Sequence, residues 1–242
     1  MTVSNPQYVV IGIFVAYMAI VAALWKVNEV DYATIGDSTR NIQRGIVIPI
    51  GVGALMLIVA TTVLDAWHDV LFEPERSGPA WALAVPVLFV VVALINTSLI
   101  DYRSPNAAAL PWLALGTLFV GFAEEVVTRG LLIVGLREAG WSPVAVYLVS
   151  TALFSILHSI NALFGQSMKV TLTQMVMTVL AGTALYITRL TTGSLVVGIL
   201  AHALWDFGTL GITTTKSQQK PLAGLVAFVM FGISMVAIWF VL

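Results

Sequence analysis

Three short stretches of an otherwise apolar chain carry ionisable side chains at helical spacing. They contain Glu124, Glu125 and Arg129 in the first, His158 in the second, and His202 and Asp206 in the third. Carboxylates and imidazoles are the groups that most often transfer protons or bind metal ions in enzymes. A charged side chain at the centre of a bilayer costs at least about 2.5–3.5 kcal/mol. These groups therefore need partners, and we expect them to face one shared polar cavity.

Helix geometry divides the first stretch into two roles. Residues four apart lie on one face of an α-helix, so Glu125 can pair with Arg129, whereas Glu124 points about 100° away. Glu124 then faces the cavity without an obligatory counter-charge, which makes it the candidate for chemistry. His202 and Asp206 are also four apart and offer an imidazole and a carboxyl group to the same space.

A purely structural interpretation is that these groups only hold helices together through interhelical hydrogen bonds and ion pairs. For Glu125 and Arg129 alone, that interpretation is at least as good as a functional one. For the whole set it is weaker, because two histidines and three carboxyl groups are more than packing requires. Intramembrane ionisable clusters are functional candidates by default.

The rest of the chain must supply the spans that position these residues. It has 242 residues, 59% of them hydrophobic and 10% charged, with a mean hydropathy of +0.98, which excludes an ordinary soluble domain. At about 20 apolar residues per span, we expect an all-α, polytopic transmembrane bundle of about eight helices, the first a retained span and not a cleaved signal. They are placed near 8–25, 46–64, 80–100, 107–136, 142–164, 170–188, 193–210 and 221–242.

These spans predict a single integral membrane domain, 1–242, with a motif-bearing core at about 107–210. The connections 26–44 and 65–79 are too short to fold alone. Lys and Arg number seven on one side and three on the other, which favours both termini outside and the connections after odd-numbered helices in the cytoplasm. The net charge of −1 gives no electrostatic reason to bind nucleic acid, so the lipid bilayer is the expected partner. The absence of cysteine excludes disulfides and thiolate chemistry.

In order and spacing, the stretches resemble the EExxxR, FxxxH and HxxxN/D motifs of the CPBP family. Members of this family are CAAX proteases and bacteriocin-processing proteins, and the family is also called Abi or type II CAAX prenyl endopeptidase-like. Here the motifs are Glu124-Glu125-x-x-x-Arg129, Phe154-x-x-x-His158 and His202-x-x-x-Asp206. The resemblance implies an intramembrane endopeptidase, in a prokaryotic plasma membrane, whose substrate is a membrane-associated or lipidated peptide or protein entering from the membrane.

The resemblance also assigns roles to individual residues. The catalytic set is Glu124, His158, His202 and Asp206, and the supporting set is Glu125, Arg129 and Phe154. In one compatible mechanism, Glu124 and His158 deprotonate a water while groups of span 193–210 stabilise the oxyanion. In the other, the two histidines and a carboxylate of Glu124 or Asp206 bind Zn²⁺, which lowers the pKa of a bound water to roughly 7.

Asp206 bears on this choice, because an ionised carboxylate cannot donate to an oxyanion as the Asn of other family members can. The sequence favours a metal or a donor supplied by histidine alone, and both stay open.

No His-Glu-x-x-His zincin motif occurs. Two further residues are interpreted as unremarkable: Ser167 as a loop residue and not a nucleophile, and His68 as a solvated residue of the acidic connection. The rival interpretation is a non-proteolytic membrane protein, either a proton- or ion-coupled transporter or a bacteriocin-immunity or scaffold protein.

Overall fold

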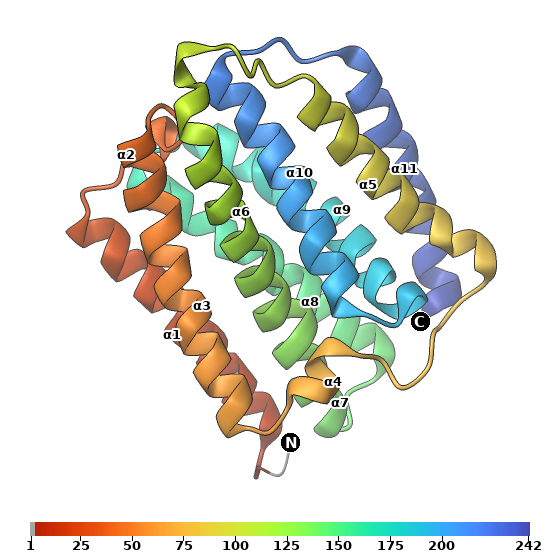
Figure 1. Ribbon diagram of the computed structural model, residues 1–242. Coiled ribbons are helices and arrows are strands. Elements are labelled where there is room, and N and C mark those ends of the chain that lie inside the picture. Colours follow the sequence, from red (N-terminus) through yellow and green to blue (C-terminus); the bar gives the residue numbers. More distant parts are fainter. Residues whose placement is uncertain (1–2) are drawn as a thin grey trace.

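The computed structural model describes residues 3–242 and confirms the expected all-α polytopic bundle. Within this range, seven helical segments are long and apolar enough to cross a membrane: Pro6–Val27, Thr39–Val63, Ala80–Ser98, Pro143–Phe164, Met168–Thr192, Leu195–Thr215 and Pro221–Val241. A further helical run from Leu110 to Glu138 lies among them (Figure 1). Successive long helices run in opposite directions, because short connections join them.

The element bounds follow the predicted spans closely. The long helices are α1 Pro6–Val27, α3 Ile48–Val63, α5 Ala84–Ser98, α6 Leu110–Glu125, α8 Pro143–Leu157, α9 Met168–Thr192, α10 Leu195–Thr215 and α11 Pro221–Val241. The short helices are α2 Thr39–Ile42, α4 Trp67–Leu71 and α7 Leu132–Glu138. Two segments are π-helical, η2 Gln43–Val47 and η5 Val126–Leu131; the 3₁₀ segments are η1 Tyr32–Thr34, η3 Ala80–Leu83, η4 Pro105–Ala109 and η6 His158–Phe164.

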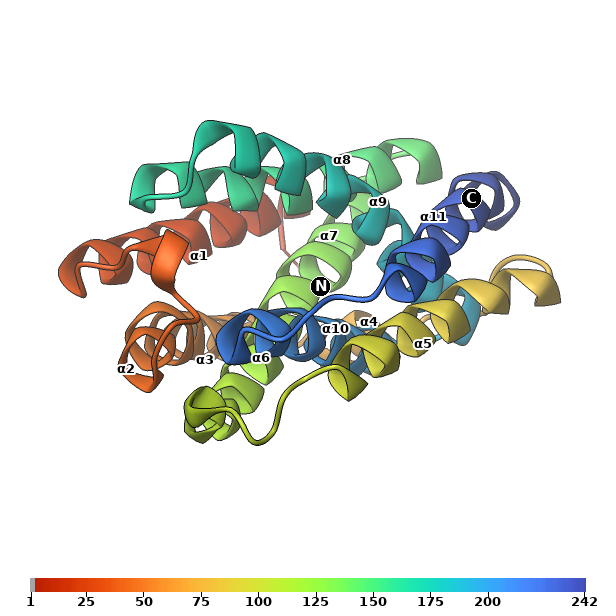
Figure 2. The ribbon, with the colours of Figure 1, turned by 90° about the horizontal axis from the view of Figure 1, so that it is seen from above.

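The helix formed by α6, η5 and α7 is the core of the molecule. Every residue from 123 to 136 is buried. Figure 2 shows why: α1, α8 and α9 lie on one side, α3, α5 and α10 lie on the other, and α7 runs between them. The part of this span that carries the first motif is therefore covered by the other helices.

Close contact between α6 and α10 depends on Gly121. A Cβ at this position would lie 2.6 Å from the carbonyl oxygen of Ile199 and 2.9 Å from the amide nitrogen of Ala203. Both are backbone atoms of a regular helix, which cannot move aside without shifting the helix. Gly121 thus sets the separation of the two helices that carry the first and third motifs.

The predicted connection 26–44 is partly helical, and this corrects the expected start of the second span. Thr39 begins a helix that continues through η2 into α3, and Pro49 lies where η2 passes into the first turn of α3. Proline has no N–H for the carbonyl four residues earlier, which is that of Gly45. The indole N–H of Trp25 donates to this carbonyl at 2.7 Å, so the irregular turn is satisfied from α1.

We expect Gly121→Ala to lower the free energy of unfolding by at least about 1–3 kcal/mol, because the added methyl group overpacks a backbone contact. Thermal unfolding of the detergent-purified protein measures this as a lower melting temperature. Gly232→Ala is the matched control, because an added Cβ on this α11 residue meets nothing within 4 Å. Equal melting temperatures for the two variants would show that the helices can separate freely.

Candidate active site

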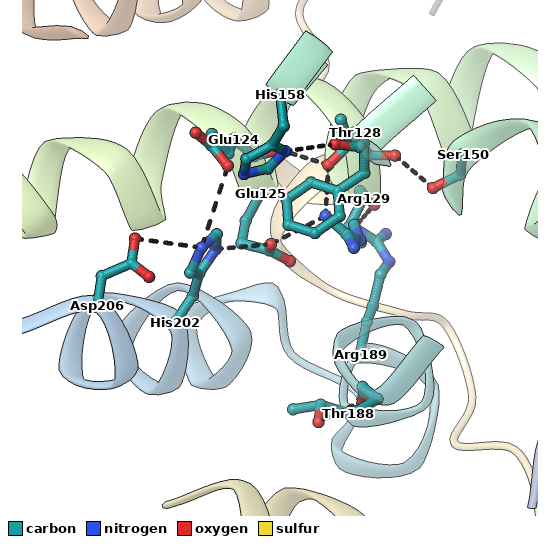
Figure 3. A network of polar contacts seen from close by, with 12 residues as sticks. Glu124, Glu125, Thr128, Arg129, Ser150, His158, Thr188, Arg189, His202 and Asp206 are labelled. Atoms are coloured by element: carbon teal, nitrogen blue, oxygen red, sulfur yellow. Dashed lines mark hydrogen bonds and ion pairs between the residues drawn. The ribbon is translucent and has the colours of Figure 1, made fainter. Parts of the chain in front are cut away.

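A cavity of about 340 Å³ lies within the bundle, and all four predicted catalytic residues line it. Glu124 reaches it from α6, His158 from the first turn of η6, and His202 and Asp206 from α10. Figure 3 shows Glu124, His202 and Asp206 converging from two helices. The predicted supporting pair, Glu125 and Arg129, does not line the cavity and lies behind it, as the helix geometry indicated.

Glu124 presents a free carboxylate oxygen to this space. Its Oε2 atom is buried and, among the described residues, has no hydrogen-bond partner. The imidazole Nε2 of His202 lies 4.0 Å away, beyond hydrogen-bonding distance. A buried polar atom without a partner costs about 1–3 kcal/mol, so the fold keeps this oxygen available to a molecule that enters the cavity.

His202 is held by carboxylates on both sides of its ring. Its Nδ1 lies 3.0 Å from Oε1 of Glu125 and its Nε2 lies 3.5 Å from Oδ2 of Asp206. An ionised carboxylate only accepts hydrogen bonds, so Nδ1–H donates to Glu125. This contact fixes the ring and directs Nε2 toward the cavity, between Glu124 and Asp206.

The buried pair behind the cavity is tied to both imidazoles through one aromatic ring. Arg129 Nη1 lies 3.1 Å from Glu125 Oε1, and both side chains have no exposed surface. The guanidinium carbon of Arg129 lies 3.7 Å from the centroid of the Phe154 ring, which is a cation–π contact. The edges of the same ring meet His158 and His202 at centroid distances of 5.4 and 5.7 Å. Phe154 is thus a buried neighbour of the site and not a lipid-facing aromatic.

The backbone fixes the tautomer of His158. Its Nδ1 lies 2.9 Å from the carbonyl oxygen of Phe154. A carbonyl can only accept, so Nδ1 carries the hydrogen and the neutral ring keeps a lone pair on Nε2. Because His158 lines the cavity, this lone pair is available to a bound water.

Arg189 also supports the site, although its place at the end of a span predicted only a charge of a connection. It is 1% exposed and donates from Nη1 to the carbonyls of Arg129 and Val70, each at 2.6 Å, and from Nη2 to that of Asp69 at 2.7 Å. Its Nε pairs with Glu73. The carbonyl of Arg129 belongs to the π-helical η5, where the regular hydrogen-bond ladder is interrupted. Arg189 therefore joins α9 and the segment 69–73 to the turn that carries Arg129.

Glu73 likewise differs from its expected place among solvated residues of an acidic connection. Its side chain is 4% exposed, and Arg137 also pairs with it at 2.7 Å. No local pattern could reveal the pair of Glu73 and Arg189, because the two residues are 116 positions apart. The helical spacing of each motif, by contrast, was readable in the sequence.

Two residues that the sequence analysis set aside lie outside the site. Ser167 is the N-cap of α9 and accepts a hydrogen bond from the amide of Val170, which is an ordinary role for serine. His68 exposes 83% of its side chain in the short helix α4. The interpretation of His68 as a solvated residue is confirmed.

The donor set does not match a zinc site in this arrangement. Across residues 3–242, no three His, Asp or Glu side chains form a group that could hold a metal ion. The nitrogen of His202 that faces the cavity is 3.5 Å from Asp206 and 4.0 Å from Glu124, and His158 enters from a different helix. We therefore derive no step of the reaction through a metal.

Comparisons with known proteins bear on this geometry. The model of a family described as Type II CAAX prenyl endopeptidase Rce1-like matches residues 106–208. This range contains every residue of the three motifs, and the match confirms the family resemblance that they carry. A search of curated proteins found no match to the chain.

We expect Arg189→Lys to lower the free energy of unfolding by about 1–3 kcal/mol, because Lys keeps the charge but cannot reproduce the planar set of donors to Glu73 and three buried carbonyls. The melting temperature in detergent measures the loss. Arg137→Lys is the control: Arg137 also pairs with Glu73 but its side chain is 37% exposed, so we expect a loss below about 1 kcal/mol. Equal effects would contradict a special role for Arg189.

Metal dependence is tested by elemental analysis of the purified protein together with chelation. Because no three described His, Asp or Glu side chains form a group that could hold an ion, we expect less than one metal ion per chain and activity that survives strong chelators. A stoichiometric metal, with activity lost on chelation and restored by Zn²⁺, would establish the metal mechanism instead.

Proposed function

Because residues 106–208 match the Rce1-like family model, we propose that this chain is an intramembrane endopeptidase of CAAX type that uses Glu124 to activate water. The observation that supports this most directly is the free, buried Oε2 atom of Glu124 beside two imidazoles in a single cavity. The Oε2 atom of Glu125 also lacks a partner among the described residues, but Glu125 does not line the cavity, so of the two glutamates Glu124 is the one that can meet a molecule there. The geometry leaves room for a water and a peptide carbonyl.

In the proposed reaction, a water lies between Glu124 and His158. Glu124 accepts one of its protons, and the lone pair on Nε2 of His158 accepts a hydrogen bond from the other, which orients the oxygen. The water oxygen attacks the carbonyl carbon of the scissile peptide bond and gives a tetrahedral intermediate. The tautomer set by the carbonyl of Phe154 is the one this step needs.

His202 is placed to stabilise the oxyanion. When its ring carries both hydrogens, Nδ1–H donates to Glu125 and Nε2–H points toward the cavity, where it can donate to the negative oxygen. The C–N bond then breaks, and the proton held by Glu124 passes to the leaving amine. Asp206 is a positioning residue in this scheme, because its carboxylate lies 3.5 Å from Nε2 of His202 and cannot itself donate while ionised.

The walls of the cavity suit a hydrophobic or lipidated substrate. Between its polar groups they are formed by apolar side chains, including Met18, Val21, Leu157, Met177 and Leu185. Apolar walls around a few convergent polar groups are typical of a binding site. We therefore propose that the substrate is a lipidated or membrane-associated peptide or protein that reaches the cavity from the bilayer.

The test is cleavage of a quenched-fluorescent peptide library, with and without a C-terminal lipid, by the detergent-purified protein. We expect Glu124→Gln to lower the rate by about 10²–10⁴-fold, because the amide cannot take a proton from water, and to leave the melting temperature unchanged or higher. Glu75→Gln, an acid-to-amide change at an exposed position, should behave as the wild type.

Equal cleavage by wild type and Glu124→Gln would show that the activity does not come from this site. No cleavage of any library peptide by the wild type would favour the non-proteolytic alternative, in which the same buried cluster relays protons or holds the bundle together.

A further inference from the structure

We propose that Tyr32, Asn161 and Gln174 form a second polar site in the same cavity, which binds the main chain of the peptide substrate. The inference rests on the proposed endopeptidase function and names the part of the substrate that the cavity recognises. All three residues line the cavity, from η1, η6 and α9 respectively. None belongs to the three motifs.

Two of the three side chains are joined by a hydrogen bond. Asn161 is 3% exposed, and its Nδ2 donates to Oε1 of Gln174 at 3.0 Å. Tyr32 lines the same cavity beside them. Burial raises the pKa of Tyr32 to about 12, so its hydroxyl keeps its hydrogen at neutral pH and can donate.

These contacts leave a definite bonding capacity. A primary amide has two N–H donors and a carbonyl with two lone pairs. Asn161 donates one N–H to Gln174, so its carbonyl oxygen can accept a bond from a ligand. Gln174 takes part through Oε1, so its N–H groups can donate. One donor and one acceptor, side by side, match the C=O and N–H of a peptide main chain.

Tyr32 is held in place by neighbouring aromatic rings and by the cap of its own segment. Its ring packs against Trp25 at a centroid distance of 5.4 Å, and Trp25 packs against Phe164 at 5.3 Å. Asp31 caps η1 by accepting from the amide of Ala33 at 3.0 Å. Gly165, with φ of +99°, lets Asp31 approach, since a Cβ there would lie 2.2 Å from Asp31 Oδ1. The connection after α1 is thus fixed against the end of η6.

The distance to the proposed catalytic centre fits an extended peptide. His158 and Asn161 are three residues apart in the 3₁₀ segment η6, where side chains at i and i+3 point the same way and lie about 6 Å apart along the axis. An extended chain advances about 3.3 Å per residue. The second site therefore contacts the main chain about two residues from the scissile bond.

The ligand class follows from the charge of the site. Tyr32, Asn161 and Gln174 are uncharged, so a phosphate or a metal ion would find no opposite charge on them. Apolar walls between the two polar ends leave main-chain amides without water, and an unpaired buried amide costs about 1–3 kcal/mol. Neutral donors and acceptors in this position supply those missing bonds whatever the side chains of the peptide.

The experiment uses the library peptide that is cut fastest and a set of its analogues in which one backbone amide at a time is an ester. An ester lacks the N–H and is a weaker acceptor. In the wild type, we expect one analogue, about two residues from the scissile bond, to lower kcat/KM by roughly five- to tenfold. In Gln174→Met and Asn161→Leu, the same analogue should be cut as fast as the all-amide peptide. Gln166→Met is the control, because Gln166 bonds Thr171 at 2.8 Å and does not line the cavity.

A purely structural role for the amide pair would slow every peptide and every analogue by the same factor in Gln174→Met and Asn161→Leu, and that result would overturn the inference. Wild-type rates for both variants with every analogue would overturn it too. In either case, cleavage that still requires Glu124 leaves the endopeptidase function intact. If the wild type cuts no peptide, the proposed function fails, and this inference fails with it.

Discussion

The ion pair between Glu125 and Arg129 is the contact on which the rest of the site depends. Both side chains are fully buried, and breaking such a pair leaves an uncompensated charge that costs about 3–5 kcal/mol. Glu125 at the same time accepts from Nδ1 of His202, and Arg129 lies over the ring of Phe154. One pair thereby fixes α10 and the end of α8 against α6. The imidazoles of His158 and His202 take their places relative to this pair.

Two adjacent glutamates on one helix, Glu124 and Glu125, lie in different environments. Glu125 faces the protein, where its Oε1 atom has Arg129 and His202 as partners. Glu124 instead lines the cavity, and its unpaired Oε2 atom is the one that a bound molecule can meet. The 100° turn between neighbours separates a structural carboxylate from one that is free to react. The enclosing helices then exclude lipid and bulk water from the free carboxylate, which strengthens its interactions with any molecule that enters.

The remaining structure serves this helix in two ways. Glycine allows close contact, as Gly121 does for α6 against α10. Side chains from distant segments satisfy the irregular turns: the indole of Trp25 binds the carbonyl of Gly45 near η2, and Arg189 binds the carbonyl of Arg129 in η5. In a bilayer, backbone groups left unpaired by an irregular turn cannot hydrogen-bond to water. The protein must therefore supply their hydrogen-bond partners. The same rule explains why uncharged amides at the far end of the cavity are suited to a peptide main chain.

The sequence by itself determined the class of fold, the spans to within a few residues except for the start of the second, the pairing of Glu125 with Arg129, and the resemblance to the family. Each of these is local: hydropathy decides whether a segment enters the bilayer, and 3.6-residue periodicity decides which neighbours share a face. Only the tertiary structure decided that His202 bonds Glu125, that Arg189 reaches Glu73 across 116 positions, and that Tyr32 lines the same cavity as Gln174. These contacts join segments far apart in the chain, and their geometry is set by how whole helices pack. The start of the second span was misplaced for the same reason, since Trp25, on another helix, bonds the carbonyl of Gly45 in the irregular turn before α3.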